Sequence, residues 1–159
     1  MSELQNAALA RETFDTLCRA LDKDNWKYKK NEEDLEVECT VHGEDLPMDV
    51  TFRVRPDKMV ITLLSHIPFV INEDKRIDAA IAVSAVNNML VDGCFDYNVT
   101  SGHIFFRMAH SFVDSKISEE VFIYMLICSC QTIDDYNDKF LMLSKGMMSL
   151  DQFIASLQQ

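Results

Sequence analysis

Residues 72–112 read NEDKRIDAAIAVSAVNNMLVDGCFDYNVTSGHIFFRMAHSF, and this stretch predicts a helix followed by a β-hairpin. Asn72 is expected to cap the helix, because the acidic residues directly after it suit the positive end of the helix dipole. The pair Asp92-Gly93 is expected to end the helix. Two segments of alternating polarity then predict the hairpin strands, and Ser101-Gly102 predicts a two-residue turn between them.

One face of this helix is expected to lie against the sheet. Its residues recur at helical spacing and are mostly small, which allows a close approach: Ile77, Ala80, Ile81, Ser84, Ala85 and Asn88. The amides of Asn87 and Asn88 are unusual late in an apolar helix, because a buried amide needs hydrogen-bond partners. We expect these amides to bond backbone groups of the adjacent sheet, and either to fix the helix against the hairpin or to prepare the C-terminal end of the helix. A ligand-binding role is the alternative.

Polar and apolar residues also alternate earlier in the chain. This alternation predicts a short strand around Trp26–Tyr28 and longer strands at residues 35–41 and 48–54, each with one apolar face. Residues 59–64 are apolar on both sides, which indicates a strand that is central or covered on both faces. Short turns between the strands indicate an antiparallel sheet with one face open to water.

Helical periodicity predicts three further helices, at residues 2–22, 118–145 and 149–157. The last of these opens on a capping-box pattern that runs from Ser149 to Gln152. The helices are expected to cover the apolar face of the sheet. The predicted fold class is therefore α+β, an antiparallel sheet of about five to six strands with helices packed on one face.

The 159 residues are expected to form a single domain, 1–159, with residues 147–159 as a C-terminal helical extension. The net charge of −11 would repel phosphate backbones and anionic lipid, so neither nucleic acid nor membrane is an expected partner. No signal peptide or membrane span is visible in the sequence. The scattered cysteines are therefore expected to be free thiols in the cytoplasm: Cys18, Cys39, Cys94, Cys128 and Cys130.

The residue types that most often carry chemistry form no motif. The histidines lack the spacing of metal ligands, and each is expected at the surface or at a strand end: His42, His66, His103 and His110. Cys128 and Cys130 are two positions apart on a helix, so their side chains point away from each other. Residues 22–24 resemble the start of a calcium loop that lacks its later glycine and glutamate. We therefore expect no catalytic residue, no cofactor and no metal.

The C-terminal segment is the strongest functional candidate in the sequence. Methionines and one apolar helix face would form a flexible apolar surface, of the kind that adapts to varied partners. The predicted protein-binding residues are Met147, Met148, Leu150, Phe153, Ile154 and Leu157. The alternative is that this stripe packs on its own domain, as amphipathic helices usually do.

The order of predicted elements resembles that of the YbjN-like family, described as bacterial sensory transduction regulators, whose fold is similar to that of type III secretion chaperones. The resemblance is carried by the helix at 79–88, the hairpin at 94–106 and the apolar helix from Val121, and it extends over about residues 14–143. It implies a small cytoplasmic bacterial protein without enzymatic activity that acts through contacts with other proteins. Small size and strong acidity also suit a secretion chaperone.

Two classes of function follow. The first is a non-enzymatic protein-binding module, regulator or chaperone-like, that binds another protein through an exposed sheet edge or through its C-terminal helix. The second is a small-molecule sensor or enzyme, with a pocket in which residues distant in sequence converge, such as His103, His110 and Asn88. A homodimer is compatible with both classes, because exposed strand edges and apolar helices favour two-fold contacts.

Overall fold

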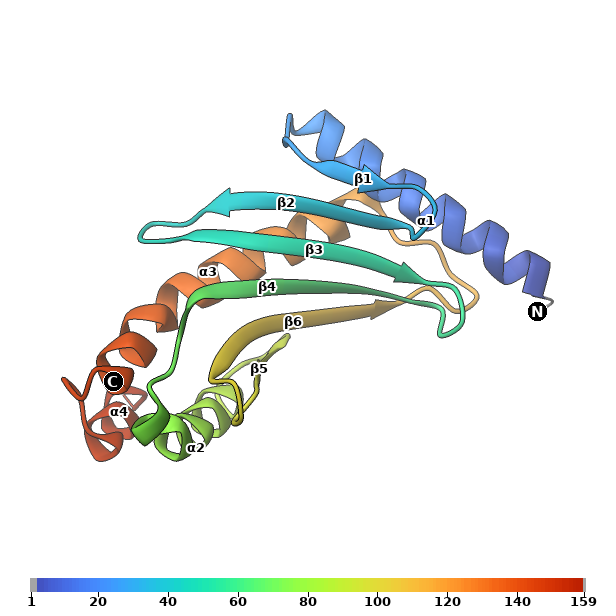
Figure 1. Cartoon of the computed structure of the whole chain (residues 1–159). Coiled ribbons are helices and arrows are strands. Elements are labelled where there is room, and N and C mark those ends of the chain that lie inside the picture. Colours follow the sequence, from blue (N-terminus) through green and yellow to red (C-terminus); the bar gives the residue numbers. More distant parts are fainter. Residues whose placement is uncertain (1–2, 159) are drawn as a thin grey trace.

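A six-stranded antiparallel sheet, in the order β1-β2-β3-β4-β6-β5, organises the computed structural model, which describes residues 3–158 (Figure 1). The strands are β1 (Lys29–Asn31), β2 (Glu36–His42), β3 (Pro47–Arg55), β4 (Val60–Val70), β5 (Cys94–Tyr97) and β6 (His103–Ser111). The helices are α1 (Glu3–Lys23), the short 3-10 helix η1 (Glu73–Lys75), α2 (Arg76–Asn87), α3 (Glu119–Ser144) and α4 (Leu150–Ser156). The predicted α+β fold class is confirmed.

The helices cover one face of the sheet. Side chains that alternate along β2, β3, β4 and β6 are buried on that face, while their neighbours on the other face are largely exposed or half-buried. Helices α1 and α3 contact each other and the sheet, and α2 and α4 lie together at one end of it (Figure 1). Large rings from both layers fill the core, among them Phe14, Phe52, Phe106, Phe122 and Phe140. None of the helices described for residues 3–158 has an apolar run long enough to cross a bilayer.

The buried face of helix α2 is opposite to the face that was predicted to lie against the sheet. Its buried residues are Ala79, Ala82, Val83 and Val86, whereas Ile77 is 67% exposed and Ile81 is 45% exposed. The prediction was wrong because α2 is apolar around most of its circumference. Both faces satisfy helical spacing, so periodicity does not decide which of them is covered.

Asn72 does not cap a helix through its side chain. Its backbone N–H donates to Ser144 Oγ at 2.9 Å, and its side-chain Nδ2 donates to the Ser144 carbonyl oxygen at 2.9 Å. Asn72 therefore joins the start of η1 to the end of α3. Helix α2 ends at Asn87, earlier than the predicted Asp92-Gly93 stop.

The hairpin connection is longer than predicted, because β5 ends at Tyr97 and β6 begins at His103. The Asn98 side-chain oxygen accepts the N–H groups of Thr100 and Ser101, both at 3.0 Å, which forms the turn. Gly102 follows with φ +79, a conformation that glycine adopts without strain. The predicted two-residue turn is therefore wrong, since Asn98 starts the turn three residues earlier.

The outer edge of β5 is closed by a side chain of α2. Asn87 Nδ2 donates to the Phe95 carbonyl oxygen at 2.9 Å, and the Phe95 N–H donates to Asn87 Oδ1 at 2.7 Å. The amide thus pairs with both backbone groups of Phe95 as a neighbouring strand would. The structural role expected for the amides is confirmed for Asn87, whereas Asn88 is exposed.

The opposite edge of the sheet is only partly covered, because β1 begins at Lys29 and not near Trp26 as predicted. The Trp26 N–H donates to the Leu21 carbonyl oxygen at 2.9 Å, and the Tyr28 hydroxyl donates to Asp22 Oδ1 at 2.9 Å. Both bonds hold residues 26–28 on the end of α1. The chain therefore meets β2 only from Lys29 onward.

Replacing Asn87 by alanine should lower the free energy of unfolding by about 1–3 kcal/mol, because both backbone groups of Phe95 would lose their partner. Urea denaturation of the full chain measures this loss. The matched control is Asn88→Ala, which should change the stability by about 0.5 kcal/mol or less because Asn88 is exposed. Equal losses in both variants would contradict the assigned role of Asn87.

Candidate functional site

The six residues predicted to bind a partner do not form one exposed surface. Phe153 is fully buried, and its ring centroid lies 5.4 Å from that of Phe140. Met147 is 69% exposed. The other four are half-buried: Met148, Leu150, Ile154 and Leu157.

The burial of Phe153 has a local cause in the start of α4. The predicted capping box forms, with Ser149 Oγ accepting the Gln152 N–H at 3.2 Å and Gln152 Oε1 accepting the Ser149 N–H at 2.9 Å. This cap sets the direction of α4, which packs on α2 and α3. Phe153 is therefore a core residue and must be removed from the predicted surface. A binding role for the other five residues stays a prediction.

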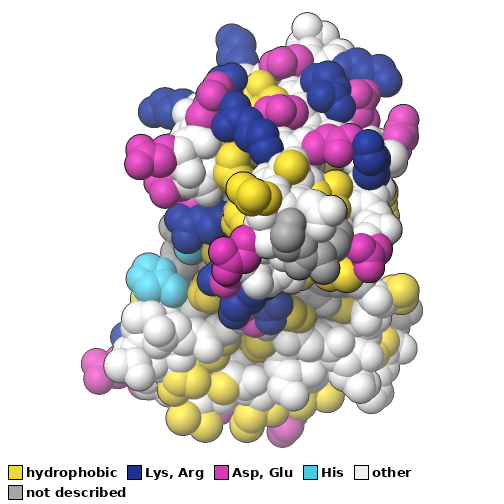
Figure 2. Space-filling model, turned by 90° about the vertical axis from the view of Figure 1, so that its right-hand side faces the viewer, with side chains coloured by type: hydrophobic (Ala, Val, Ile, Leu, Met, Phe, Trp, Pro, Cys, Tyr) yellow, Lys and Arg dark blue, Asp and Glu magenta, His cyan; other side chains and the backbone are white. Residues whose placement is uncertain are grey.

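The exposed face of α2 is an apolar surface that has no partner among residues 3–158. A shallow groove on it is lined by Ile77, Ala80, Ile81, Ser84, Ala85 and Asn88. Figure 2 shows hydrophobic atoms and few charged side chains at the lower end of the molecule, where Figure 1 places α2. The upper end carries densely mixed positive and negative side chains. Exposed apolar area of this kind marks a contact surface.

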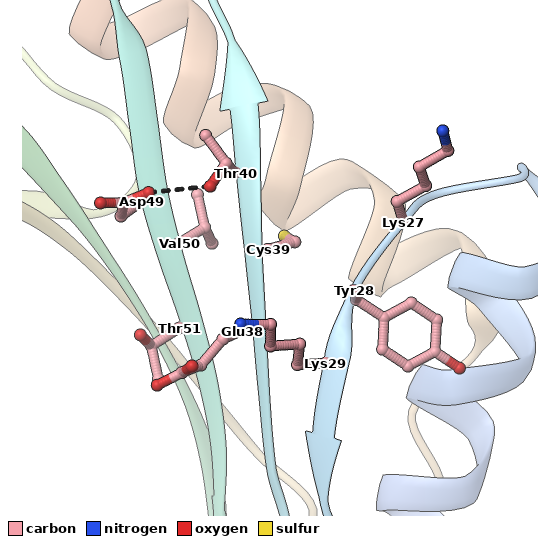
Figure 3. Close-up of a pocket in the computed structure, with 9 residues that line it drawn as sticks. All are labelled: Lys27, Tyr28, Lys29, Glu38, Cys39, Thr40, Asp49, Val50 and Thr51. Atoms are coloured by element: carbon pink, nitrogen blue, oxygen red, sulfur yellow. Dashed lines mark hydrogen bonds between the residues drawn. The ribbon is translucent and has the colours of Figure 1, made fainter.

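A second hollow of about 660 Å³, here called the open-face hollow, lies where β1 diverges from β2 (Figure 3). Its polar lining comes from the segment before β1, from the start of β1, from β2 and from β3: Lys27, Lys29, Glu38, Thr40, Asp49 and Thr51. Thr40 Oγ1 donates to Asp49 Oδ1 at 2.9 Å, as the dashed line in Figure 3 shows. The hollow therefore presents charges of both signs and hydroxyl groups, and it suits a polar occupant.

A third hollow of about 310 Å³, here called the helix-side hollow, lies on the other side of β2 against α3. Trp26, Val41, Leu126 and Ile127 give it an apolar lining. At its end, Asp134 Oδ2 accepts the Glu44 N–H at 3.1 Å and fixes the loop after β2. The lining suits one large apolar side chain.

The thiols beside these hollows are poorly suited to nucleophilic chemistry. Burial, together with the nearby Asp49 carboxylate, raises the pKa of the Cys39 thiol to about 11. Burial also raises the pKa of the Cys130 thiol to about 11, and Asp134 adds to the effect. A raised pKa leaves the thiol protonated at neutral pH, and the thiolate is the reactive form.

The histidines occupy the strand and surface positions expected of them, and all four are exposed. His66 lies beside Phe105, with ring centroids 5.6 Å apart. His103 and His110 lie near opposite ends of β6, and Asn88 lies on the exposed face of α2. The converging pocket considered for these three residues therefore does not form. Within residues 3–158, no group of three or more histidine, cysteine, aspartate or glutamate side chains is arranged to hold a metal ion.

A family model described as "Putative bacterial sensory transduction regulator" matches residues 13–142, which is most of the sequence. The chain belongs to the YbjN family. The search of curated proteins found no match.

Two solved structures share the fold of this YbjN-family chain at low sequence identity. The first is "Crystal structure of YbjN, a putative transcription regulator from E. coli", with a TM-score of 0.57, 14% identity, and coverage of 79% of this chain and 92% of that one. The second is "Crystal Structure of the ExsC-ExsE Complex", with a TM-score of 0.61, 11% identity, and coverage of 83% and 96%. The predicted resemblance to the YbjN family and to secretion chaperones is confirmed at the level of fold.

Sequence reasoning missed the helix-side hollow in this YbjN-family chain. Trp26 and Ile127 lie far apart in the sequence and meet only because residues 26–28 follow α1. Trp26 alternates with charged neighbours, and this pattern predicted a paired strand. One signal was available: the predicted first strand was much shorter than the strand beside it, and that difference leaves part of an edge uncovered.

Replacing Phe153 by alanine should lower the free energy of unfolding of the YbjN-family chain by about 3–5 kcal/mol, because a buried ring is lost from the core. Chemical denaturation followed by circular dichroism measures the effect. Met147→Ala is the control from the same segment and should change the stability by about 0.5 kcal/mol or less. A Phe153 variant as stable as the Met147 variant would place Phe153 at the surface and restore it to the predicted binding site.

Proposed function

We propose that this YbjN-family protein is a non-enzymatic protein-binding module, a regulator or chaperone-like protein that acts through contacts with other proteins. Membership of a family described as regulators supports the proposal. The similar fold of ExsC, a type III secretion chaperone solved in complex with ExsE, supports a protein as the partner. A dedicated type III secretion chaperone is the more specific form of the same proposal.

The observation that carries the proposal is the apolar surface that the fold leaves uncovered. Ile77 and Ile81 are exposed on α2, and Ile127 is 45% exposed at the helix-side hollow. The rest of the surface is rich in charge, with a net charge of −11 for the chain. This charge disfavours nucleic acid and anionic membranes and steers basic protein segments toward the molecule.

The exposed face of α2 supports a homodimer. Its bulky residues, Ile77 and Ile81, lie toward the start of the helix, and its small residues, Ser84 and Ala85, lie toward the end. In a contact whose two-fold axis is perpendicular to α2, the two helices run antiparallel, so the bulky end of each would meet the small end of the other. Such a face is self-complementary in shape and carries few charges that would repel a second acidic copy.

We further propose that residues 1–159 act as one domain, with 147–159 attached through α4, and that the protein works in the cytoplasm. The packing of α4 on α2 and α3 supports the first statement. The free state of all five cysteines supports the second, because a reducing compartment preserves thiols.

A pull-down with the tagged full chain from bacterial lysate, with quantitative mass spectrometry, tests partner binding. We expect one dominant protein, retained at about 0.15 M salt and depleted when Ile127→Glu is the bait. The matched control is Val113→Glu, an exposed valine away from the hollows, which should retain the partner. Enrichment of no protein over an untagged control would contradict the proposed function and favour the small-molecule sensor.

Replacing Ile81 by glutamate should convert a dimer into a monomer, because it would place two like charges in a desolvated contact. Light scattering coupled to gel filtration gives the mass of each species. The wild-type chain and Val113→Glu should both elute at twice the mass of one chain. A wild-type mass of one chain, or an Ile81 variant that stays dimeric, would show that α2 is not a dimer contact.

A further inference from the structure

Half of the outer edge of β2 has no strand beside it. Strand β1 pairs only with residues 36–38, and no backbone hydrogen bond between described residues joins 26–28 to 39–42. Figure 3 shows the backbone at Lys27 and Tyr28 diverging from β2. The uncovered edge therefore runs from residue 39 to the end of β2.

The hydrogen-bond pattern identifies which backbone groups are free. The Val54 N–H donates to the Leu35 carbonyl oxygen at 3.0 Å, and the Gly43 N–H donates to the Leu46 carbonyl oxygen at 3.0 Å. These bonds continue the β2–β3 register, so the odd-numbered residues of β2 are those that exchange hydrogen bonds with β3. The N–H and C=O groups of Thr40 and His42 consequently point away from the sheet.

The two edges of the sheet differ in how their backbone groups are satisfied. At the β5 edge, Asn87 supplies a side-chain donor and acceptor to Phe95. At the β2 edge, Thr40 and His42 have no such partner among the described residues. Unpaired groups of this kind form a template for another extended chain.

The free edge lies between the two hollows. Thr40 lines the open-face hollow, and Val41 lines the helix-side hollow. Successive side chains of a strand point to opposite faces of a sheet. A strand added beside residues 40–42 would therefore send alternate side chains into chemically different hollows.

We infer that the β2 edge at residues 40–42 is a docking strand for an extended segment of a partner protein. The inference rests on the proposed protein-binding function and names its site. The segment would exchange backbone hydrogen bonds with Thr40 and His42. Its residue opposite Val41 would be large and apolar and would fill the helix-side hollow, against Trp26 and Ile127.

Charge sets the preference for the neighbouring positions of the segment. Residues opposite Thr40 and His42 would project over the open face, where Glu38 and Asp49 line the hollow. Lys27 and Lys29 form its other wall, so a polar side chain fits between them. Because the whole chain carries a net charge of −11, basic residues flanking the polar-apolar-polar core would speed association.

A displayed library of random peptides of about twelve residues, selected on the immobilised full chain, supplies the probe. The enriched peptides are synthesised with a fluorescent label and titrated by anisotropy. We expect sequences that alternate polar and apolar residues, with affinity lowered about tenfold or more by Thr40→Pro. Proline removes the outward N–H of residue 40 and leaves the β2–β3 ladder intact.

Three further variants separate docking from folding. Thr40→Val keeps the backbone N–H but removes the hydroxyl that bonds Asp49, so it should lower affinity less than Thr40→Pro does. Ile127→Glu leaves β2 untouched and should lower affinity about tenfold or more, because it charges the helix-side hollow. Val113→Glu should have no effect, since Val113 is exposed elsewhere.

Peptides that bind Thr40→Pro and Ile127→Glu as tightly as wild type would overturn the inference, as would a selection without enriched peptides. If Thr40→Pro does not fold, the comparison of Ile127→Glu with Val113→Glu decides. A partner protein that the pull-down recovers equally on wild type, Thr40→Pro and Ile127→Glu would refute edge docking while the proposed function stands.

Discussion

The helices of this chain cover only one face of the sheet, and that coverage is the constraint on which the rest of the structure depends. Alternate side chains of β2, β3, β4 and β6 are buried under α1 and α3, so the other face must accept water. The six-stranded sheet also remains an open sheet with two edges, because its order does not close into a barrel. The surfaces available for contact are thus the open face, the edges and the outer sides of the helices.

Each edge is set by a hydrogen bond made from a helix. At one edge, the Asn87 amide at the end of α2 pairs with Phe95 and closes β5. At the other, the Leu21 carbonyl oxygen at the end of α1 holds the Trp26 N–H and keeps residues 26–28 away from β2. The Asn87 side chain satisfies the backbone groups of Phe95 at the β5 edge. The backbone bond between Trp26 and Leu21 leaves part of the β2 edge without a partner strand. This difference connects the fold to the site that we propose for partner binding.

Much of the architecture could be predicted because side-chain alternation reports burial directly. The strands around Val37 and Phe52 were predicted within a residue or two, as was the capping box at Ser149. The buried face of α2 could not be predicted. Val83 lies on the buried face and Ile81 on the exposed face, and both belong to apolar residues that recur at helical spacing. Sequence gives the spacing of apolar residues, and only the packed layers decide which of two apolar faces is covered.

The candidate site shows the same limit. Phe153 belongs to an amphipathic stripe whose burial depends on α2 and α3, so its core role is visible only in the fold. The free edge of β2 depends on where the chain leaves α1, a geometric property that no motif encodes. The family resemblance could be stated from the order of elements alone, because that order is what related folds share at 11–14% identity.

Amide hydrogen exchange along β2 in the free protein reports directly whether this edge is open. We expect alternation, with slow exchange at Cys39 and Val41, which bond to β3, and fast exchange at Thr40 and His42. Glu38 should exchange slowly, because β1 covers it. Slow exchange at Thr40 and His42 as well would contradict an open edge, since it would mean that residues 26–28 or another chain already cover it.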